Sequence, residues 1–290
     1  MKTEQKNIGI LLVAVSGACF GLIALFTRMA YAGGTSTATL LFLRFLIGAL
    51  FLLLLMAVKK APMPLKKEIL SYLLLGAIPY FGQSFCYFSA LKHASSGVVV
   101  LLLYTYPAMV MLGSAVFFKE KITPVKILCL VLALGGAFLI ISSEFQSSLT
   151  GILLSVLCAV IYSLYILLSS RIVRPGMGLQ SSAFIMLGVA AVYGVLTAAE
   201  GFAPPTRMIG YAGVLLLAVV STAIAFWTFF EGLERVGPST ASLASTTEPL
   251  TGVLASVLFL SEPMTMKTVI GGCLVLSALI IIARYDRGPA

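Results

Sequence analysis

The sequence has very few charged residues. Only 10% of its 290 residues are Asp, Glu, Lys or Arg, whereas a soluble domain has about 25%. So little charge cannot cover a water-facing surface, and 60% of the residues are hydrophobic. The composition therefore excludes an ordinary soluble protein and indicates a protein of the membrane interior.

Residues that carry out catalysis are also scarce. The chain has one histidine, His93, at the edge of an apolar segment, so no Ser-His-Asp arrangement can be built at a membrane-buried site. Its five cysteines show no paired spacing, and no His/Cys/Asp cluster has the spacing of metal ligands. A phosphate-binding glycine loop is missing as well. The sequence thus predicts no enzyme, no metal or other cofactor, and no nucleotide-driven pump.

What the sequence has instead is a series of apolar runs of about 18 to 24 residues, each long enough to cross a hydrocarbon core of roughly 30 Å. These runs lack the alternation of polar and apolar residues that lipid-facing strands require. We therefore predict an all-α integral membrane fold. The ten predicted transmembrane helices span residues 8–30, 36–58, 69–90, 96–118, 124–141, 150–172, 179–199, 209–231, 238–260 and 266–284.

The cations predict how the helices cross the membrane. A net charge of +9 could indicate a nucleic-acid partner, but the positions of the charges argue against one. With a cytoplasmic N-terminus, fourteen Lys and Arg residues fall in cytoplasmic segments, three fall outside and two lie within spans. This is the positive-inside bias of membrane proteins. It predicts a multi-pass inner-membrane protein with both termini in the cytoplasm and no nucleic-acid partner.

The sequence repeats itself at an offset of 142 residues. Pro107 matches Pro249 and Glu120 matches Glu262, together with several Phe, Thr and Leu pairs. Fixed-offset similarity is the mark of a duplicated structural unit. The repeat is therefore real, although leucines coincide easily in membrane proteins.

The repeat divides the chain into two five-helix units, residues 1–142 and 143–290. Five is an odd number, so the second unit must enter the membrane from the opposite side. Such inverted repeats are the architecture of many secondary transporters. We therefore expect two inverted halves around a central cavity.

Short motifs resemble a known family. Leu-Tyr-Thr-Tyr-Pro at 103–107 and Phe-Phe-Lys-Glu at 117–120 resemble the fourth span of EamA-type proteins in the drug/metabolite transporter superfamily. Thr-Thr-Glu-Pro-Leu at 246–250 and Leu-Ser-Glu at 260–262 resemble the ninth. The resemblance covers the whole chain. It implies that the first, third, fourth, sixth, eighth and ninth spans surround a cavity, with the fifth and tenth at the periphery, and it leaves the substrate open.

Glu248 is the leading candidate for substrate binding. It lies near the middle of the ninth span, where a charge costs roughly 2.5–3.5 kcal/mol. Its carboxylate would bind a substrate ammonium group or a coupling proton. Alternatively, it pairs with Arg44 of the second span or caps backbone groups freed by Pro249. We predict a binding role for Glu248 and a structural ion pair for Arg44.

Proline and tyrosine residues complete the predicted site. Pro107 and Pro249 each remove a backbone hydrogen bond within a span, which predicts paired gating hinges, with a static bend as the alternative. Mid-span tyrosine hydroxyls need partners, whereas small hydroxyl residues also serve helix packing. With Glu248, the predicted substrate-binding residues are Tyr80, Gln83, Tyr87, Tyr104, Tyr106, Tyr162, Tyr165, Trp227 and Ser245.

These features predict a secondary transporter that exports a small polar metabolite, namely an amino acid or a related zwitterion or amine. One acid among aromatic side chains suits an ammonium group beside an apolar moiety. Proton coupling is left open and depends on Glu248. A lipid or lipid-linked-sugar flippase of the same superfamily is the alternative. The expected partners are the substrate and membrane lipids, and the expected state is a monomer or a weak homodimer.

Overall fold

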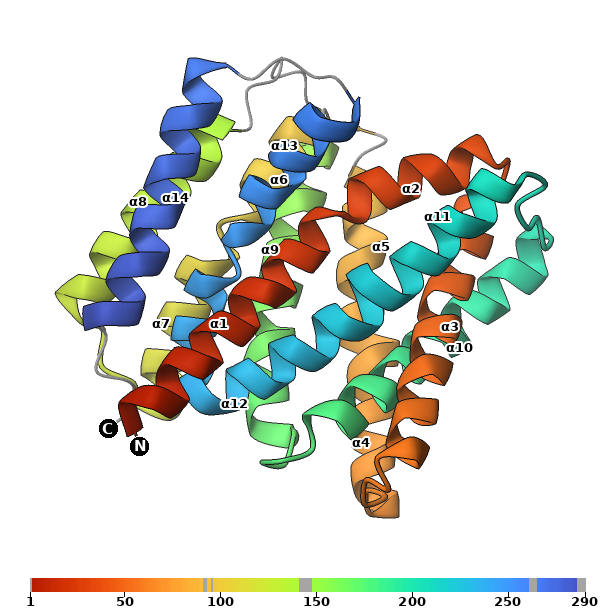
Figure 1. The fold of residues 1–290 in the computed structure, drawn as a ribbon, viewed down its shortest axis with the longest axis horizontal. Coiled ribbons are helices and arrows are strands. Elements are labelled where there is room, and N and C mark those ends of the chain that lie inside the picture. Colours follow the sequence, from red (N-terminus) through yellow and green to blue (C-terminus); the bar gives the residue numbers. More distant parts are fainter. Residues whose placement is uncertain (1, 91–92, 95, 141–147, 261–264, 286–290) are drawn as a thin grey trace.

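The computed structural model describes residues 2–90, 93–94, 96–140, 148–260 and 265–285, and these fold into helices with short connections (Figure 1). In lipid, helices satisfy every backbone hydrogen bond internally. In chain order the elements, of which η1 and η2 are π-helices, are α1 (Lys2–Gly21), α2 (Ile23–Ala32), α3 (Thr37–Val58), α4 (Lys66–Leu75), η1 (Gly76–Tyr80), α5 (Phe81–Ala90), α6 (Ser96–Leu103), α7 (Tyr106–Phe118), α8 (Pro124–Ile140), α9 (Leu149–Ile172), α10 (Gly178–Glu200), α11 (Met208–Ala218), η2 (Val219–Ile224), α12 (Ala225–Ala244), α13 (Thr247–Leu260) and α14 (Met266–Tyr285).

The predicted all-helical fold of ten spans is confirmed. Seven of the described helical segments are long and apolar enough to cross a membrane, and three shorter apolar helices complete the set. The eighth and ninth spans meet within α12, where the chain turns at Gly237. Gly237 has a φ of 76°, which glycine adopts at little cost because it has no Cβ.

Two spans in each half are interrupted at matching places. The third span contains η1 and the eighth contains η2, which nearly coincide when the halves are aligned. The fourth span breaks between α6 and α7, and the ninth breaks at the corresponding place between α12 and α13. Irregular backbone at membrane depth is tolerated only where it is covered by protein or lines a water-filled space. These four places therefore mark the interior of the bundle.

The sequence gives a local reason for each interruption. Pro79 lies inside η1 and has no N–H to donate. In η2, the Thr222 hydroxyl donates to the carbonyl of Leu217 at 2.8 Å and so satisfies a carbonyl of the wide turn. Pro107 and Pro249 fall in the first turns of α7 and α13, where a missing N–H costs no hydrogen bond. The helices thus break just before the two prolines, and a gating motion about them stays a prediction.

The two halves cross the bundle in opposite directions. α1 packs on α12 as α9 packs on α5. A Cβ on Gly9 would lie 2.6 Å from Val236, and a Cβ on Gly151 would lie 2.7 Å from Ala94, two contacts that the repeat offset interchanges. α1 begins at one end of the bundle and α9 at the other (Figure 1). The inverted repeat is therefore a property of the structure.

The outer helices pair with their repeat equivalents. α8 and α14 lie side by side at one edge (Figure 1), and α3 packs on α10 away from that edge. In the first pair, a Cβ on Gly136 would lie 2.6 Å from the carbonyl oxygen of Gly271, and the reverse distance is the same. Such close backbone approach is typical of small residues in membrane helices. The fifth and tenth spans thus have the peripheral position that the resemblance implied.

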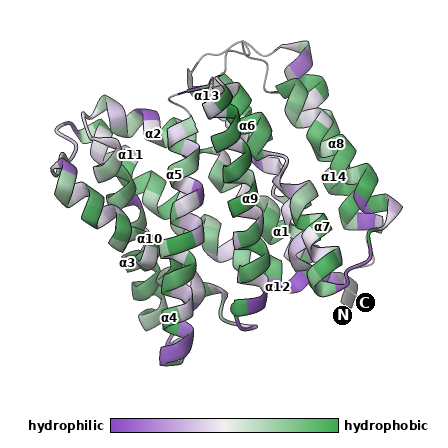
Figure 2. Cartoon of the chain, turned by 180° about the vertical axis from the view of Figure 1, so that it is seen from behind, coloured by the Kyte–Doolittle hydropathy of each residue, from purple (hydrophilic) through white to green (hydrophobic). Residues whose placement is uncertain are grey.

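One end of the bundle is rich in cations. There the Lys6 ammonium donates to the carbonyl of Ala283 at 3.3 Å, and Arg174 pairs with Glu68 at 3.2 Å. Figure 2 shows hydrophobic helices with hydrophilic residues gathered toward their ends. We call the end that carries Lys6, Lys59, Lys66, Lys119, Lys121, Arg171, Arg174 and Arg235 the basic end.

Candidate substrate-binding site

Glu248 lies in the first turn of α13, directly after the break in the ninth span. Its side chain is half-buried, and its carboxylate lies within hydrogen-bonding reach of the hydroxyl of Tyr104. Tyr104 itself lies at the break in the fourth span. The two matching breaks therefore meet at one acidic side chain. No ion pair to Glu248 occurs among the residues that the structure describes.

Two glycines of α1 allow this helix to approach Glu248. A Cβ on Gly21 would lie 2.5 Å from the carbonyl oxygen of Glu248, and a Cβ on Gly17 would overlap the hydroxyl of Thr247. Nearby, the Ser16 hydroxyl donates to the carbonyl of Ala225 at 2.7 Å. The Gly-x-x-x-Gly spacing thus serves close helix contact. It places the backbone of the first span directly against the acid.

Five of the predicted tyrosines form one connected cluster, which we call the tyrosine cluster. They come from the third, fourth and sixth spans. The distances between ring centroids are 6.3 Å for Tyr104–Tyr106, 4.8 Å for Tyr106–Tyr162, 6.1 Å for Tyr162–Tyr165 and 5.1 Å for Tyr165–Tyr80. Offset and edge-to-face contacts in this range are favourable for aromatic rings. The cluster begins at the partner of Glu248 and extends toward the basic end.

Gln83 and Tyr87 lie on α5 and make different contacts. The Gln83 amide donates to the sulfur of Cys158 at 3.4 Å, and the Cys158 thiol donates to the Gln83 carbonyl at 3.4 Å. These contacts tie α5 to α9. Tyr87 contacts the ring of Phe88 at 5.5 Å and lies within electrostatic reach of Glu248. Tyr87 is therefore near the acid, whereas Gln83 is engaged between helices.

Trp227 and Ser245 make different contacts from the tyrosine cluster. The Trp227 ring faces the Lys59 ammonium at 4.4 Å, which is a cation–π contact at the basic end. The Ser245 hydroxyl donates to the carbonyl of Ala241 at 2.8 Å and also lies within hydrogen-bonding reach of Tyr106. Ser245 thus adjoins the tyrosine cluster, and Trp227 has no described ring contact with it.

Arg44 is buried in α3 and is held by the π-helix η2. Its Nε donates to the Thr222 hydroxyl at 2.6 Å, and its Nη2 donates to the carbonyl of Ser221 at 3.3 Å. Arg44 lies within electrostatic reach of Glu248, but no ion pair joins these two described residues. The guanidinium is thus fixed to the eighth span and held apart from the acid, and a structural ion pair of Arg44 stays a prediction.

The seventh span contributes a residue that sequence reasoning missed. The Tyr193 hydroxyl is 2.7 Å from that of Ser84, and its ring stacks on Phe45 at 6.1 Å. Phe45 in turn contacts Tyr80, which belongs to the tyrosine cluster. The resemblance implies that other spans line the cavity, and the seventh is not among them. A tyrosine in the middle of an apolar run was the signal.

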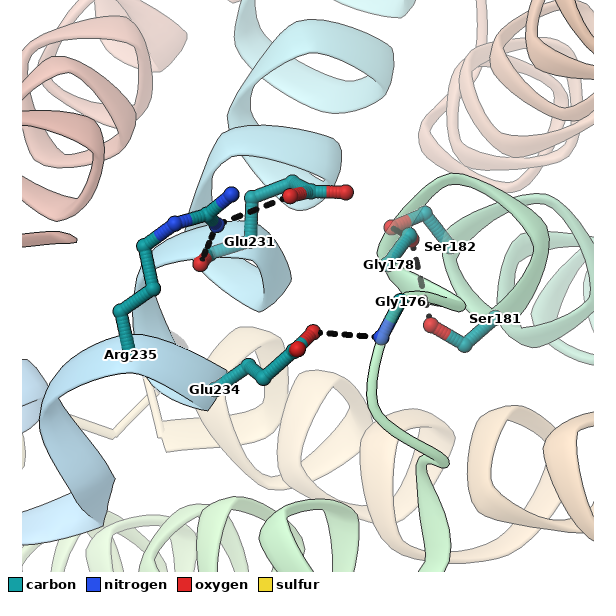
Figure 3. A network of polar contacts seen from close by, with 7 residues as sticks. All are labelled: Gly176, Gly178, Ser181, Ser182, Glu231, Glu234 and Arg235. Atoms are coloured by element: carbon teal, nitrogen blue, oxygen red, sulfur yellow. Dashed lines mark hydrogen bonds and ion pairs between the residues drawn. The ribbon is translucent and has the colours of Figure 1, made fainter. Parts of the chain in front are cut away.

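A cavity of about 950 Å³ opens at the basic end. The C-terminal ends of α7 and α9 and the middle of α12, around its turn at Gly237, line it, together with Glu68 at the start of α4. Glu234 lines the cavity, and its carboxylate accepts the Gly176 N–H at 2.8 Å (Figure 3). Phe230 lines the cavity, and its ring lies 6.5 Å from that of Tyr165. The inner end of the cavity thus adjoins the tyrosine cluster.

The fold and the site define a class of protein. Ten apolar spans in two inverted halves, with an acid and a tyrosine cluster where the helices break, are the features of a multi-pass membrane transporter. The model of the EamA-like transporter family matches residues 7–142 and again residues 149–284. The chain therefore belongs to the EamA-like transporter family and is not an enzyme.

Known relatives agree with this membership. The transporter YcbK of Bacillus subtilis (strain 168) is 27% identical over 286 residues, which cover 93% of this chain and 91% of YcbK. The aromatic amino acid exporter YddG of Ancylobacter novellus is 27% identical over 164 residues, which cover 53% of this chain and 55% of YddG. A crystal structure with 22% identity has a TM-score of 0.84 and covers 97% of this chain and 99% of its own. This last likeness shows the shared fold.

Proposed function

We propose that this transporter is a secondary carrier that exports an amino acid or a related amine by alternating access. It would lie in the cytoplasmic membrane with both termini inside, since the positive-inside rule assigns the basic end to the cytoplasm. It would act as a monomer or a weak homodimer. The substrate would enter at the basic end and leave at the opposite end.

The observation that carries this proposal is the position of Glu248. It is an acid at a break in a membrane span, and it has no ion-pair partner among the described residues. A charge at this depth is expensive unless a group of opposite charge meets it. A substrate ammonium group would meet it with charge-assisted hydrogen bonds, which are roughly twice as strong as neutral ones.

Two further groups favour an amino acid over a simple amine. Arg44 uses two of its five N–H donors on Thr222 and Ser221, so others are available for a substrate carboxylate. The tyrosine cluster offers ring faces to an ammonium group and to an apolar side chain. The name of the relative YddG, an aromatic amino acid exporter matched over about half of this chain, favours the same substrate class.

The paired interruptions favour alternating access. Each half has a π-helix in one span and a break in the next, at positions that the repeat interchanges. Irregular helix segments of this kind are common where transporters bind their substrate. A motion available to one half is therefore available to the other in the opposite direction. Alternate opening of the two ends around Glu248 follows from this equivalence.

Binding of three related compounds tests the proposed recognition. L-Phenylalanine, its methyl ester and its N-acetyl derivative share one side chain, but the ester lacks the carboxylate and the acetyl compound lacks the ammonium group. We expect the N-acetyl derivative to bind about 100-fold more weakly than phenylalanine, since a buried charge left unpaired costs about 2 kcal/mol or more. In Glu248→Gln this difference should fall below about threefold. Equal binding of all three by the natural protein would refute an ammonium-binding Glu248.

Transport measurements in proteoliposomes test the proton coupling that the sequence leaves open. Radiolabelled phenylalanine flux is measured with and without a pH gradient, in the natural protein and in Glu248→Gln. A carrier coupled through Glu248 should run faster with the gradient and lose this gain in the variant. Equal rates in both conditions would identify a facilitator, which keeps the export proposal and removes the coupling.

A further inference from the structure

We propose that Glu120 and Ser169 form a second ammonium-binding site, in the cavity at the basic end. A substrate ammonium group would bind there before it reaches Glu248. The order of the two sites rests on the proposed export function, whereas the binding site itself rests on the cavity and its unpartnered atoms.

Glu120 directs a carboxylate into this cavity. It follows α7, and the preceding Lys119 has a φ of 55°, a left-handed conformation that few residues with a side chain adopt. The Glu120 N–H donates to the carbonyl of Ser114 at 3.2 Å, which fixes the turn. The Glu120 side chain is only 9% exposed although it lines the cavity. The sequence motif Phe-Phe-Lys-Glu thus folds back into the bundle.

Only one oxygen of this carboxylate is satisfied. Oε1 accepts the Lys126 ammonium at 2.5 Å, whereas Oε2 is buried and has no hydrogen-bond partner among the described residues. An unsatisfied buried polar atom costs about 1–3 kcal/mol, and more when it is charged. Lys126 orients the acid and leaves its second oxygen available. The arrangement lacks a hydrogen-bond donor at that oxygen.

Ser169 supplies a second unpartnered atom on the facing wall. Serines within α9 otherwise bond back to their own helix, as Ser163 does to the carbonyl of Ala159 at 2.7 Å. The Ser169 hydroxyl is fully buried and has no hydrogen bond of normal geometry within the described part of the chain, and it lines the same cavity as Glu120. The Tyr165 hydroxyl lies one turn away and within reach of Ser169, but it too has no such hydrogen bond. The free atoms here are a carboxylate oxygen and hydroxyls, which suit a cationic donor.

The other acids of the cavity are already engaged. Both oxygens of Glu68 are used, one by Arg174 at 3.2 Å and one by the N–H of Leu65 at 2.8 Å. Glu234 accepts the N–H of Gly176 (Figure 3). Among the described lining residues, Glu120 is thus the acid with a buried free oxygen. An anion at this oxygen would be repelled, whereas a group with N–H donors would satisfy it, and a primary ammonium group carries three such donors. The cations Lys119, Lys121, Arg171 and Arg174 also line the cavity, so the proposed site is the immediate surroundings of the free Glu120 oxygen.

The two acids lie along one path. Phe230 lines the cavity and contacts Tyr165, which belongs to the tyrosine cluster that ends at Tyr104 and Glu248. Aromatic faces attract ammonium groups along such a path. A substrate would therefore pass from Glu120 over the tyrosine rings to Glu248. The cavity provides the first of two carboxylates in series.

Chemical labelling tests the first site without knowledge of the substrate. Ser170 lines the cavity and is half-buried, so Ser170→Cys provides a thiol beside the site. We measure its reaction with a methanethiosulfonate that carries ethylammonium and with one that carries ethylsulfonate, by mass spectrometry of the peptide that contains the new thiol. The cationic reagent should react about tenfold faster, the factor expected for one charge-assisted hydrogen bond. Ethylammonium chloride should slow it, whereas sodium chloride at the same concentration should not.

Variants assign the effect to Glu120. In Glu120→Gln the ratio of the cationic to the anionic labelling rate should fall about tenfold, because the charged acceptor is lost. Ser169→Ala should also lower this ratio. The matched control Glu234→Gln changes an engaged acid of the same wall and should keep the ratio within about twofold, because Gln retains an acceptor oxygen for Gly176. If Glu120→Gln fails to fold because Lys126 is left unpaired, Glu120→Gln with Lys126→Met replaces it.

The outcomes separate this site from the proposed function. Equal rates for the two reagents, a faster sulfonate, protection by sodium, or a ratio unchanged in Glu120→Gln would each overturn the ammonium site. The export proposal would stand in those cases if the phenylalanine experiments succeed. Conversely, a protein that keeps the labelling pattern but does not bind or transport phenylalanine retains the site and loses the proposed function.

Discussion

At the break in the ninth span the chain has Glu248, and at the matching break in the fourth span it has Tyr106. The backbone interruption is the same, but the chemistry differs. Glu248 lies within hydrogen-bonding reach of Tyr104, whereas Tyr106 donates to the carbonyl of Ser242 at 3.5 Å. Duplication has therefore preserved the irregular helices in both halves and left the acid in only one. At the two matching breaks there is thus one acid rather than a symmetric pair.

The helices that pack on these breaks show the same contrast. Gly21 of α1 lies against the carbonyl of Glu248. Its repeat equivalent is Ser163 of α9, whose hydroxyl donates to the carbonyl of Tyr106 at 3.3 Å. The first span is interrupted after Gly21, where α1 ends and α2 follows. The equivalent sixth span is one continuous helix, α9. A bare backbone thus approaches the acid, while a hydroxyl caps the equivalent carbonyl in the other half.

The largest effect is expected at an ion pair whose cation is present in one half only. Lys126 is buried and pairs with Glu120, and the repeat has threonine at the corresponding position 268. Lys126→Met should destabilise the protein by about 3–5 kcal/mol, because the carboxylate is left without its cation. Adding Glu120→Gln should recover most of the loss. Unfolding in mixed micelles measures this, and a loss below about 1 kcal/mol would mean that the pair is dispensable.

The next effect distinguishes the two breaks functionally. Glu248→Gln should lower phenylalanine flux about 100-fold, since removing a partner from a charged pair costs about 2 kcal/mol or more. Tyr106→Phe, the matching position, should lower it less than about fivefold, because it loses one neutral hydrogen bond. Proteoliposome flux at equal protein content gives both values. Similar losses of flux in the two variants would contradict a functional difference between the two breaks.

A smaller effect is expected where helices touch. Gly21→Ala should destabilise the protein by about 1–3 kcal/mol, because the added methyl group would meet the Glu248 carbonyl at 2.5 Å. Gly135→Ala is the control, since nothing lies within 4 Å of a Cβ there. That change should be neutral or stabilising by up to about 1 kcal/mol. Relative to the natural protein, the melting temperature should fall clearly in Gly21→Ala and should stay the same or rise slightly in Gly135→Ala.

The smallest effect concerns the single tryptophan. Trp227 faces Lys59 and has no described ring contact with the tyrosine cluster. Trp227→Phe should change phenylalanine flux less than about twofold and should cost about 0.5–1 kcal/mol of stability from the weakened cation–π contact. A large rise in KM, with kcat unchanged, would instead place Trp227 in the substrate path and correct the extent of the site.

Periodicity and the internal repeat predicted the fold, because apolar runs of membrane length and a fixed offset between halves are visible in the sequence itself. They also predicted Glu248 and the tyrosines near it, since polar groups in apolar runs are conspicuous. The spacing of residues along the chain does not predict which side chains of distant spans contact each other. The position of Trp227 over Lys59, the attachment of Arg44 to Thr222 and the inward turn of Glu120 therefore required the structure.

The two π-helices could be predicted from the sequence only in part. Pro79 made an irregularity in the third span predictable in principle. The eighth span has no proline in η2, and its wide turn depends on the hydroxyl of Thr222 bonding to Leu217. A threonine in an apolar run has many other uses, so Thr222 alone does not predict a π-helix. It does so only when the repeat aligns this segment with η1. Alignment of the two halves in the structure shows that η1 and η2 occupy equivalent positions, which neither half shows by itself.

Accessibility of position 248 tests the central claim most directly. Glu248→Cys is labelled with a membrane-impermeant cationic thiol reagent in right-side-out and in inverted vesicles, and Leu254→Cys, at an exposed apolar position of the same helix, is the control. We predict that the thiol of Glu248→Cys reacts from both sides of the membrane and that the thiol of Leu254→Cys reacts from neither. Reaction at position 248 from one side only, or only with a lipid-soluble reagent, would contradict a path that opens alternately to the two sides around this residue.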